Sequence, residues 1–492
     1  MELTTVDIDI GTRSPTVLMH GSDAATLGLH PLDRVHIGTD SGTVVGIVEL
    51  SDELVDPGEL AVTRRLDHVD GVVEVTPAPR PASVEFIRKK LDDDELERDE
   101  LDRIVHDIRE DRLSDVELGA YVCAMYINDT SLAETMHLSE SMANAGETLS
   151  WQEEVVADKH CIGGVSGNRT TPILVAIVAA AGVTVPKTSS RAVTSAAGTA
   201  DTMEVFCPVD LDAKAIRRVV TETNGCLAWG GAVNLSPVDD KIIRAETPLS
   251  LDPHGQLVAS VLSKKQSAGS THVLVDIPYG EGSKVSSLAD ARELAHDFRR
   301  VGDHLGMTID CAITDGSAPI GRGVGPVLEA RDVLSVLSGS GPGDLRRKSV
   351  RLAQILLECA GADADAGEIL ESGRALDRFR DIVAAQGGDP DVTLSELVPG
   401  RHERTVTAGR DGVVTHIDNR LINEVARRAG APRAPGAGLE LHHRVGDAVA
   451  RGDPLCTIHS EDESRLAEAT DHAERAEPVR IRPPDETLVE RV

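Results

Sequence analysis

Between residues 155 and about 340, short apolar runs alternate with amphipathic segments, and this alternation constrains the fold more than any other feature of the chain. The runs THVLVDIPYG and GMTIDCAITDG are typical of strands, whereas DAKAIRRVVTETNG and LADARELAHDFRRVG have apolar residues at helical spacing. Strands that alternate with helices pack as an α/β layer with a largely buried sheet. We therefore expect an α/β domain over residues 156–395.

The flanking segments follow other patterns, so the whole chain is expected to be a multidomain α/β protein. Residues 1–80 form short alternating runs separated by Gly, Pro and Asp, which predicts a small β-barrel-like domain. Residues 83–155 have helical spacing and predict a helical domain, in which Ser114 and Glu117 form a capping box. After the turn-forming stretches QGGDPD and VPG, residues 400–492 predict a C-terminal α+β module that ends in a charged tail.

The formal net charge of −32 limits the partners of the protein. Phosphate backbones attract Lys and Arg, so this charge disfavours nucleic-acid binding. No apolar run reaches membrane-spanning length, and the start MELTTVDIDIGT has neither a basic end nor an apolar centre. We therefore expect a cytoplasmic protein without membrane contact. The seven cysteines are scattered without a C-x-x-C pair, which favours reduced thiols, and no metal or organic cofactor is expected.

Lysine is scarce, since only ten of the 50 basic residues are lysine and forty are arginine. A lysine-poor surface with diffuse acidic charge suits a very salty cytoplasm, where screening shortens to about 3 Å at molar ionic strength. This predicts a halophilic source. Seven of the ten lysines nevertheless lie between residues 159 and 284, which suggests ammonium groups that chemistry requires, with ordinary surface placement as the alternative. These are Lys159, Lys187, Lys214, Lys241, Lys264, Lys265 and Lys284.

The stretch DKHCIGGVSGNRTTP, residues 158–172, is a glycine-rich loop followed by ILVAIVAAAG, which predicts a buried helix. It is neither a Walker loop nor a G-x-G-x-x-G motif. It offers backbone N–H groups, Lys159, and Thr170 and Thr171 at the start of the helix. A helix N-terminus carries unpaired N–H donors and a partial positive charge, so the loop is a candidate site for phosphate or carboxylate. A plain turn is the alternative.

Two later stretches also carry chemistry-bearing residues. KTSSRAVTSAAGTADTMEVF has seven hydroxyl side chains between Thr188 and Thr202, with Arg191 among them. Hydroxyls donate to oxyanions and arginine can bind phosphate bidentately, although small residues also permit close helix packing. In ETPLSLDPHGQLVASVLSKKQSAGS, Asp252 precedes a proline, where most aspartates only form turns. A carboxyl group in a partly apolar cleft can keep its proton and act as a general acid.

These stretches resemble one enzyme family. SSRAVTSAAGTADTME is similar to the signature of the thymidine and pyrimidine-nucleoside phosphorylases. DKHCIGGVSGN resembles that family's K-H-S-x-G-G-V-G-D phosphate loop, with a one-residue insertion and Cys161 in place of serine. IIRAETPLSLDPHGQLVASVLSKK resembles its base-binding segment, with Arg244, Ser260 and Lys264 aligned. The extra N-terminal β domain and CAITDGSAPIGRGVGPVLEARDVL resemble, more narrowly, the archaeal AMP phosphorylases over nearly the whole chain.

The resemblance implies a glycosyltransferase that cleaves the glycosidic bond of a nucleotide with inorganic phosphate, converting AMP to adenine and ribose 1,5-bisphosphate in nucleotide degradation or salvage. It implies Asp252 as the proton donor to the departing base. The residues implied to contact the nucleotide are Gly164, Ser190, Arg191, Ala192, Val193, Thr194, Ser195, Thr199, Ser260 and Lys284. Those implied to help hold phosphate, by analogy with the nucleoside enzymes, are Lys159, Thr171, Ser189 and Lys264.

Several alternatives remain open at the level of sequence. An enzyme that prefers GMP, CMP or UMP would differ only in its contacts to the base, and a pyrimidine-nucleoside phosphorylase would need no 5′-phosphate site. A nucleotide-binding sensor could use the same cleft without catalysis, although a sensor need not keep an acid such as Asp252. The two terminal modules are expected to serve assembly, and we expect a homo-oligomer, at least a dimer.

Overall fold

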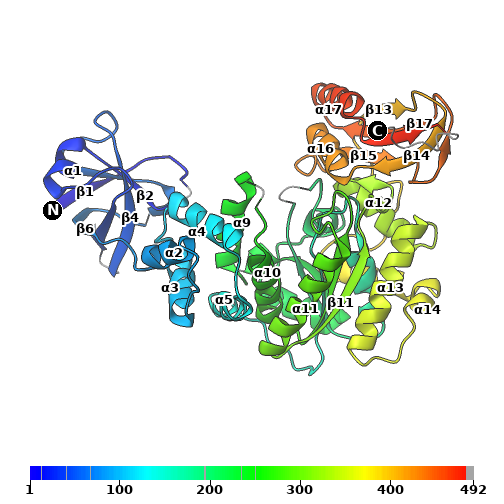
Figure 1. Cartoon of the computed structure of the whole chain (residues 1–492), viewed down its shortest axis with the longest axis horizontal. Helices are drawn as coiled ribbons and strands as arrows, with labels where there is room; N and C mark the ends of the chain where they lie inside the picture. Colours follow the sequence, from blue (N-terminus) through cyan, green and yellow to red (C-terminus); the bar gives the residue numbers. More distant parts are fainter. Residues whose placement is uncertain are drawn as a thin grey trace, which may run out of the picture. The chain divides into compact units, whose positions relative to one another are not determined.

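The computed structural model describes residues 1–12, 14–39, 42–66, 68–192, 195–233, 235–249 and 251–483. The chain divides into two compact units, and Figure 1 labels many of their helices and strands. The first unit contains Met1–Ala145 together with Pro237–Ser260, and the second contains Gly146–Ser236 together with the chain from Val261 onward.

The first unit begins with a closed six-stranded barrel, in the strand order β1-β5-β2-β4-β3-β6. Its strands are β1 (Glu2–Asp7), β2 (Thr16–Met19), β3 (Arg34–Thr39), β4 (Gly42–Leu50), β5 (Glu59–Val62) and β6 (Val72–Ala78). Alternate residues of these strands, among them Leu3, Val35 and Ile37, fill the interior, because successive side chains of a strand point to opposite faces. The barrel confirms the predicted N-terminal β domain.

Four helices follow the barrel in the first unit. They are α2 (Ser83–Leu91), α3 (Arg98–Arg109), α4 (Asp115–Ile127) and α5 (Leu132–Asn144). The capping box expected at the start of α4 is present: the backbone N–H of Glu117 donates to Ser114 Oγ (3.3 Å), and that of Ser114 donates to Glu117 Oε2 (2.8 Å). Both bonds satisfy N–H groups that a helix start leaves without intrahelical partners.

A later segment of the chain completes this helical core. Helix α9 (Pro237–Glu246) and the first half of α10 (His254–Ser267) belong to the first unit, and Val238, Ile242 and Ala259 are buried with the side chains of α2–α5. The sequence predicts this segment as part of the α/β domain at residues 156–395. Apolar spacing shows that a helix buries one face, but it does not show which domain's core that face packs against.

The second unit contains the predicted α/β layer. Its parallel strands form one sheet in the order β11-β10-β7 and a pair β8-β9. The strands are β7 (Ala157–Cys161), β8 (Val185–Ser189), β9 (Gly225–Trp229), β10 (His272–Tyr279) and β11 (Thr308–Asp315). The apolar runs that predicted two of these strands are β10 and β11, and the two amphipathic segments are helices α8 (Ala213–Thr223) and α11 (Leu288–His304). These four predictions are confirmed.

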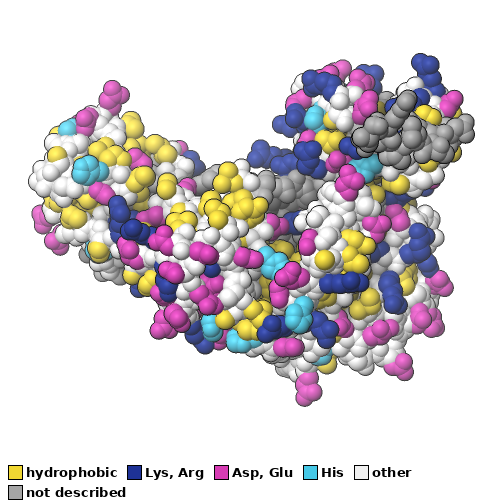
Figure 2. Space-filling model, in the orientation of Figure 1, with side chains coloured by type: hydrophobic (Ala, Val, Ile, Leu, Met, Phe, Trp, Pro, Cys, Tyr) yellow, Lys and Arg dark blue, Asp and Glu magenta, His cyan; other side chains and the backbone are white. Residues whose placement is uncertain are grey.

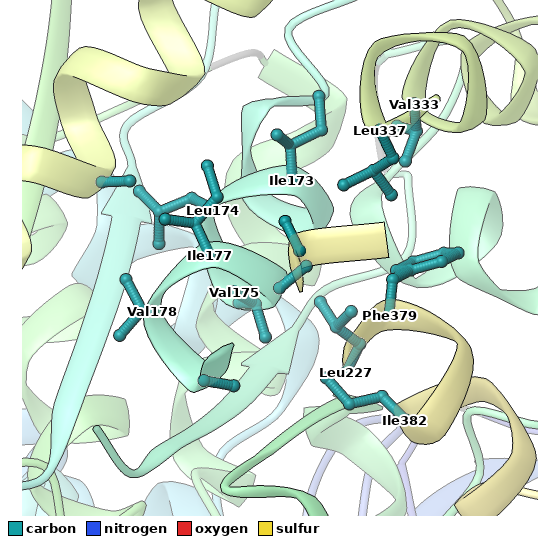
Figure 3. Close-up of a cluster of buried hydrophobic side chains, with 14 of the residues drawn as sticks. Ile173, Leu174, Val175, Ile177, Val178, Leu227, Val333, Leu337, Phe379 and Ile382 are labelled. Carbon is teal, nitrogen blue, oxygen red and sulfur yellow. The ribbon is translucent and has the colours of Figure 1, made fainter. Parts of the chain in front are cut away.

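Helix α6 (Thr170–Ala180) lies in the middle of the second unit and is apolar around its whole circumference. Such a helix must be buried on all sides. Figure 3 shows Ile173, Leu174 and Ile177 of α6 among side chains of β9 and of the helices α12 (Pro326–Leu337) and α15 (Arg374–Ala385). This core fixes the position of the α6 N-terminus, at which the glycine-rich loop ends.

The C-terminal α+β module also belongs to the second unit. Its elements are β13 (His402–Thr407), β14 (Gly412–Ile417), α16 (Asn419–Ala429), β15 (Gly438–Leu441), β16 (Ala448–Val449), β17 (Pro454–Ser460), α17 (Glu463–Ala476) and β18 (Val479–Arg482). The short strand β12 (Gly323–Val324) comes from the preceding domain and pairs with β15, so the two domains share one sheet. The module thus contains the sheets β12-β15-β17-β13 and β16-β14-β18.

Some predictions from composition can be compared with the structure. Across the described ranges, no helix has the length and apolar character needed to cross a membrane. All seven cysteines are free thiols, and Cys207, Cys226 and Cys456 are buried. Asp and Glu side chains are spread over the visible face in Figure 2 rather than gathered in one patch, as the sequence indicates.

Candidate active site

The glycine-rich loop and the hydroxyl-rich stretch both belong to the second unit, and each follows the carboxyl end of a parallel strand. The glycine-rich loop follows β7 and continues into α6, so that only Ile162–Arg169 are loop and the preceding Ala157–Cys161 are strand. The hydroxyl-rich stretch follows β8 in the same way. In open α/β sheets, ligands bind outside the carboxyl ends of the strands. This topology makes both loops candidates for one binding site.

Gly164 brings the glycine-rich loop against Lys284. Its φ of +86° is a left-handed conformation, and a Cβ at this position would lie 2.7 Å from the Lys284 backbone nitrogen. Only glycine combines this backbone conformation with such a close approach. The structure thus places two of the expected nucleotide contacts, Gly164 and Lys284, side by side.

Replacing Gly164 with alanine is expected to displace the segment around Lys284 and to lower activity at least about ten-fold. The left-handed conformation of the alanine should in addition lower the free energy of unfolding by roughly 1–2 kcal/mol. Gly182→Ala is the matched control, because Gly182 has a φ of +90° and no atom within 4 Å of the added Cβ. Urea unfolding and steady-state kinetics of both variants test this. Equal activity in the two variants would contradict it.

Lys159 is fully buried in the middle of β7, and its ammonium group faces the start of α6. Lys159 Nζ donates to Thr170 Oγ1 (3.1 Å) and to Thr171 Oγ1 (3.4 Å). Burial lowers the pKa of Lys159, against the opposing effects of Cys161 and Asp276. The structure therefore brings Lys159 and Thr171, two expected phosphate contacts, to one place, where an ammonium group and a helix N-terminus both favour an anion.

Asp276 on β10 balances the charge of Lys159. Asp276 Oδ2 lies 3.8 Å from Lys159 Nζ and 3.1 Å from Lys348 Nζ, and Thr314 Oγ1 donates to Asp276 Oδ1 (2.6 Å). Burial opposes ionisation of Asp276, but the two ammonium groups outweigh it and hold its pKa below the usual value. One carboxylate is thus shared by two cations, which leaves a net positive charge beneath the loop.

A second buried charge cluster surrounds Asp158, whose side chain leaves β7 on the face opposite to that of Lys159 because successive residues alternate. Asp158 Oδ2 accepts from Lys265 Nζ (2.8 Å) and Ser270 Oγ (3.2 Å), and Asp158 Oδ1 lies 3.6 Å from Lys187 Nζ. Burial, helped by Lys265, lowers the pKa of Lys187 to about 7. Some of the clustered lysines therefore belong to a buried ion-pair network behind the loop rather than to its surface.

His160, two residues after Asp158, lies on the same face of β7 as Asp158. Burial, followed by the charges of Lys265 and Lys187, lowers its pKa well below the ordinary value, so the imidazole is neutral at neutral pH. Next to it, burial and the Asp276 carboxylate raise the pKa of the Cys161 thiol, and Asn168 Nδ2 donates to Cys161 Sγ (3.2 Å). Cys161, which replaces the serine of the resembled motif, is therefore a neutral thiol at the last residue of β7, just before the loop.

The low pKa of His160 predicts an acid-sensitive stability. Below pH about 6.5 the unfolded chain binds a proton at this position that the folded chain does not, so stability falls as pH falls, by at most about 1.4 kcal/mol per pH unit. His160→Gln is expected to flatten this part of the pH profile. Unfolding free energies measured in urea between about pH 7.5 and pH 5 test it, and parallel profiles for the two proteins would contradict it.

The hydroxyl-rich stretch forms a loop from Ser190 to Gly198 after the last residue of β8, Ser189, and Val193 and Thr194 of this loop lie outside the described residues. Ser189 Oγ is buried and, among the described atoms, has no hydrogen-bond partner, so it is available to a bound anion. Ser195 Oγ donates to the carbonyl of Ala197 (3.0 Å), and the backbone N–H groups of Ala192 and Gly198 both donate to Asp201 Oδ2 (2.7 Å each).

The charge of Arg191 is occupied within the protein. Its guanidinium pairs with Glu204 (2.5 Å), Asp210 (3.2 Å) and Asp201 (3.6 Å), and it lies over the Trp229 ring at 5.0 Å from the centroid. These contacts anchor the loop to its own framework. The guanidinium does not therefore offer the bidentate phosphate grip that the sequence suggests, whereas the backbone around Ser190 and Ala192 remains at the loop surface.

Arg169, which the sequence analysis did not select, connects the two loops. Arg169 Nη1 donates to Thr199 Oγ1 (2.9 Å), Nη2 donates to the Ala197 carbonyl (2.8 Å), and Nε donates to the buried carboxylate of Glu329 on α12. The expected nucleotide contact Thr199 is thus tied to the end of the glycine-rich loop. The sequence contains no signal that distinguishes Arg169 from the other thirty-nine arginines, because its partners lie at distant positions in the chain.

The remaining expected residues lie on or next to helix α10. Asp252 precedes the helix, and Ser260 and Lys264 follow one turn apart within it, which confirms the predicted helix and spacing. All three side chains are half-buried. Asp252 and Ser260 belong to the first unit and Lys264 to the second, since the helix runs from one into the other.

Three domain families match consecutive parts of the chain. Residues 84–146 match the helical bundle domain of a glycosyl transferase family, residues 153–360 match its a/b domain, and residues 413–479 match the pyrimidine nucleoside phosphorylase C-terminal domain. The crystal structure of anthranilate phosphoribosyltransferase from Thermus thermophilus shares the fold, with a TM-score of 0.50 and 18% identity over 61% of this chain and 98% of that one. The family models therefore define a glycosyl transferase with a pyrimidine nucleoside phosphorylase C-terminal domain.

Full-length relatives specify the family. The chain is 61% identical to an AMP phosphorylase of Natronomonas pharaonis, a halophilic archaeon, over 100% of both chains. It is 47% identical to an AMP phosphorylase of Thermococcus kodakarensis and 44% identical to one of Pyrococcus furiosus, over 96% of each chain in both cases. The protein belongs to the AMP phosphorylase family, and the resemblance seen in its sequence is confirmed.

Proposed function

We propose that the protein catalyses the phosphorolysis of AMP to adenine and ribose 1,5-bisphosphate. The observation that carries this proposal is the buried ammonium group of Lys159, set against Thr170 and Thr171 at the N-terminus of α6 in a chain of net charge −32. A strongly acidic protein repels phosphate, so a concentrated positive site of this kind serves a specific anion. In an AMP phosphorylase that anion is inorganic phosphate.

In the proposed reaction an oxygen of inorganic phosphate forms a bond to the anomeric carbon while the bond to the base breaks. The electron pair of the broken bond leaves with the base, and Asp252 gives its proton to a nitrogen of that base. Phosphate is held by Lys159, Thr171 and Ser189, with Lys264 as a further contact. The free Oγ of Ser189 and the Lys159 ammonium supply the donors that an oxyanion needs.

We assign the nucleotide to the residues that the resemblance implies on the two loops and on α10. The proposed contacts are Gly164, Ser190, Arg191, Ala192, Val193, Thr194, Ser195, Thr199, Ser260 and Lys284. Gly164 allows close backbone approach, and Lys284 beside it brings an ammonium group suited to a 5′-phosphate. Because the guanidinium of Arg191 is bound by carboxylates, we assign its contribution to the backbone of the loop.

We also propose that the enzyme acts as a cytoplasmic homo-oligomer, built from the domains expected at 1–80, 83–155, 156–395 and 400–492. Its substrates, AMP and inorganic phosphate, are metabolites of that compartment. The assignment of adenine as the preferred base is based on the relatives alone.

The test is phosphate-dependent release of free base from AMP, GMP, CMP, UMP and uridine in molar KCl. Release from AMP above the other nucleotides, and none from uridine, supports AMP phosphorolysis. Faster release from another monophosphate would replace AMP as the substrate. Turnover of uridine alone would make the protein a nucleoside phosphorylase, and the absence of turnover in folded protein that binds AMP would favour a sensor.

A further inference from the structure

One face of helix α16, in the C-terminal module, contacts both loops of the candidate site. Asn419, Asn423 and Arg427 are spaced four residues apart, so their side chains lie along one side of the helix. Each makes a hydrogen bond to a loop at the carboxyl end of β7 or β8. We refer to these three residues as the polar face of α16.

Asn419 holds the glycine-rich loop through Ser166. Asn419 Oδ1 accepts from the Ser166 backbone N–H (2.9 Å), and the Asn419 carbonyl accepts from Ser166 Oγ (2.8 Å). Asn419 Nδ2 donates to the carbonyl of Gly316, which follows β11 (2.9 Å). Asn419 and Ser166 are 1% and 3% exposed, so these bonds are shielded from water. A buried amide without a partner costs about 1–3 kcal/mol, which Asn419 avoids here.

Asn423 and Arg427 hold the hydroxyl-rich loop one and two turns further along. Asn423 Oδ1 accepts from the Ala196 backbone N–H (3.0 Å), and Arg427 Nη1 donates to the Ser195 carbonyl (3.1 Å). Ala196 itself is fully buried in the core of the C-terminal module. The loop that follows β8 is therefore held near Ala196 by a domain more than two hundred residues away in sequence.

The C-terminal module does not need this face for attachment. Strand pairing between β12 and β15 and the apolar contacts of Val324 already join the two domains. The polar face of α16 instead bonds backbone N–H and C=O groups of irregular segments, which cannot satisfy these groups within a sheet or helix. Its side chains thus determine where the loop backbones lie, and loop backbones and hydroxyls are what a phosphate site consists of.

We propose that the polar face of α16 is a positioning element for substrate binding, which sets the geometry of both loops from the C-terminal module. This inference rests on the proposed function, because it takes the glycine-rich loop as a phosphate site and the hydroxyl-rich loop as a nucleotide site. It gives the C-terminal module a role in the reaction besides assembly. Asn419, Asn423 and Arg427 are positioning residues, since each acts through a loop residue.

The main test uses Asn423→Ala and Arg427→Ala, with Arg427→Lys as the conservative variant that keeps a donor. Arg420→Ala is the matched control, because Arg420 lies on the same helix and pairs with Glu424 in solvent. Isothermal titration of each protein with AMP, in the absence of phosphate, gives Kd without any turnover, and steady-state assays give separate KM values for phosphate and AMP. Loss of one hydrogen bond of this kind is worth about a ten-fold change in Kd.

We expect Asn423→Ala and Arg427→Ala to weaken AMP binding about ten-fold and to raise KM for AMP more than KM for phosphate, because both residues hold the loop assigned to the nucleotide. Arg427→Lys and Arg420→Ala should stay near wild type. Hydrogen exchange should quicken in peptides that contain Ala196 and not in those of the α17 region. If Kd for AMP is unchanged in folded Asn423→Ala and Arg427→Ala, or if the arginine-to-lysine variant is as weak as the alanine variant, the inference is wrong.

A failure of the proposed function gives a different result. If the wild-type protein releases no base from AMP, the kinetic measurements are not possible, but AMP titration and hydrogen exchange still show whether α16 positions a nucleotide site. If Asn423→Ala destabilises the protein, hydrogen exchange becomes faster throughout the C-terminal module. In that case the comparison of Arg427→Ala with Arg427→Lys shows whether α16 positions the loop.

Discussion

Replacing Lys159 with methionine is expected to lower kcat/KM for phosphate about 10²–10³-fold, the loss seen when one preorganised donor to a reacting oxyanion is removed. The side chain is fully buried, and its ammonium group stands 3.1 Å from Thr170 Oγ1 at the head of α6. Methionine has a similar length and fills the same space without charge. The loss should appear in kcat/KM for phosphate much more than in KM for AMP, because Lys159 is assigned to phosphate rather than to AMP.

The variant should remain folded, which makes the result interpretable. Removing Lys159 does not isolate Asp276, since Lys348 Nζ still lies 3.1 Å from its carboxylate. Lys214→Met is the matched control, because Lys214 is exposed on α8 in the same unit. Unfolding midpoints in molar KCl should be compared for all three proteins before kinetics. Retention of half the wild-type kcat/KM by folded Lys159→Met would remove Lys159 from the site.

Replacing Asp252 with asparagine is expected to lower kcat about 10²–10⁴-fold, the usual contribution of a positioned general acid. Asparagine keeps the shape and most hydrogen bonds of the side chain but cannot give up a proton at neutral pH. Since substrate contacts are retained, KM for AMP should change little. Asp303→Asn, an exposed change of the same type, serves as the control.

A change of leaving group tests the role of Asp252 more sharply. A nucleotide whose base already carries a positive charge departs as a neutral base and needs no proton from the enzyme. With such a substrate the defect of Asp252→Asn should shrink at least about ten-fold relative to its defect with AMP. An equal defect with both substrates would show that Asp252 acts in binding or folding instead of proton transfer.

The sequence predicted those parts of the fold that local pattern controls. Alternation and helical spacing identified β10, β11, α8 and α11, and the pair Ser114–Glu117 identified the start of α4. By contrast, the residues of β7 are predicted as part of the glycine-rich loop, because Asp158, Lys159 and His160 are polar. Their burial depends on ion pairs with Lys265 and Asp276, more than a hundred residues away, and such pairs leave no trace in local periodicity.

The same limit applies to the candidate site. Residue types and the resemblance identified Lys159, Thr171 and Gly164, which lie where loops and a helix N-terminus meet. Arg169 and the polar face of α16 were missed, since their significance is a set of hydrogen bonds to distant backbone groups. For Arg191 the residue type alone was misleading, because three carboxylates and Trp229 take up its charge.

The most direct test of the account follows the fate of inorganic phosphate. Purified protein in molar KCl is incubated with AMP and isotopically labelled phosphate, and the products are separated and analysed by phosphorus NMR and mass spectrometry. The account predicts adenine and ribose 1,5-bisphosphate in equal amounts, with the label on the phosphate at the anomeric carbon only. Unlabelled ribose 5-phosphate beside adenine would show hydrolysis, and would contradict phosphorolysis and the phosphate site built around Lys159.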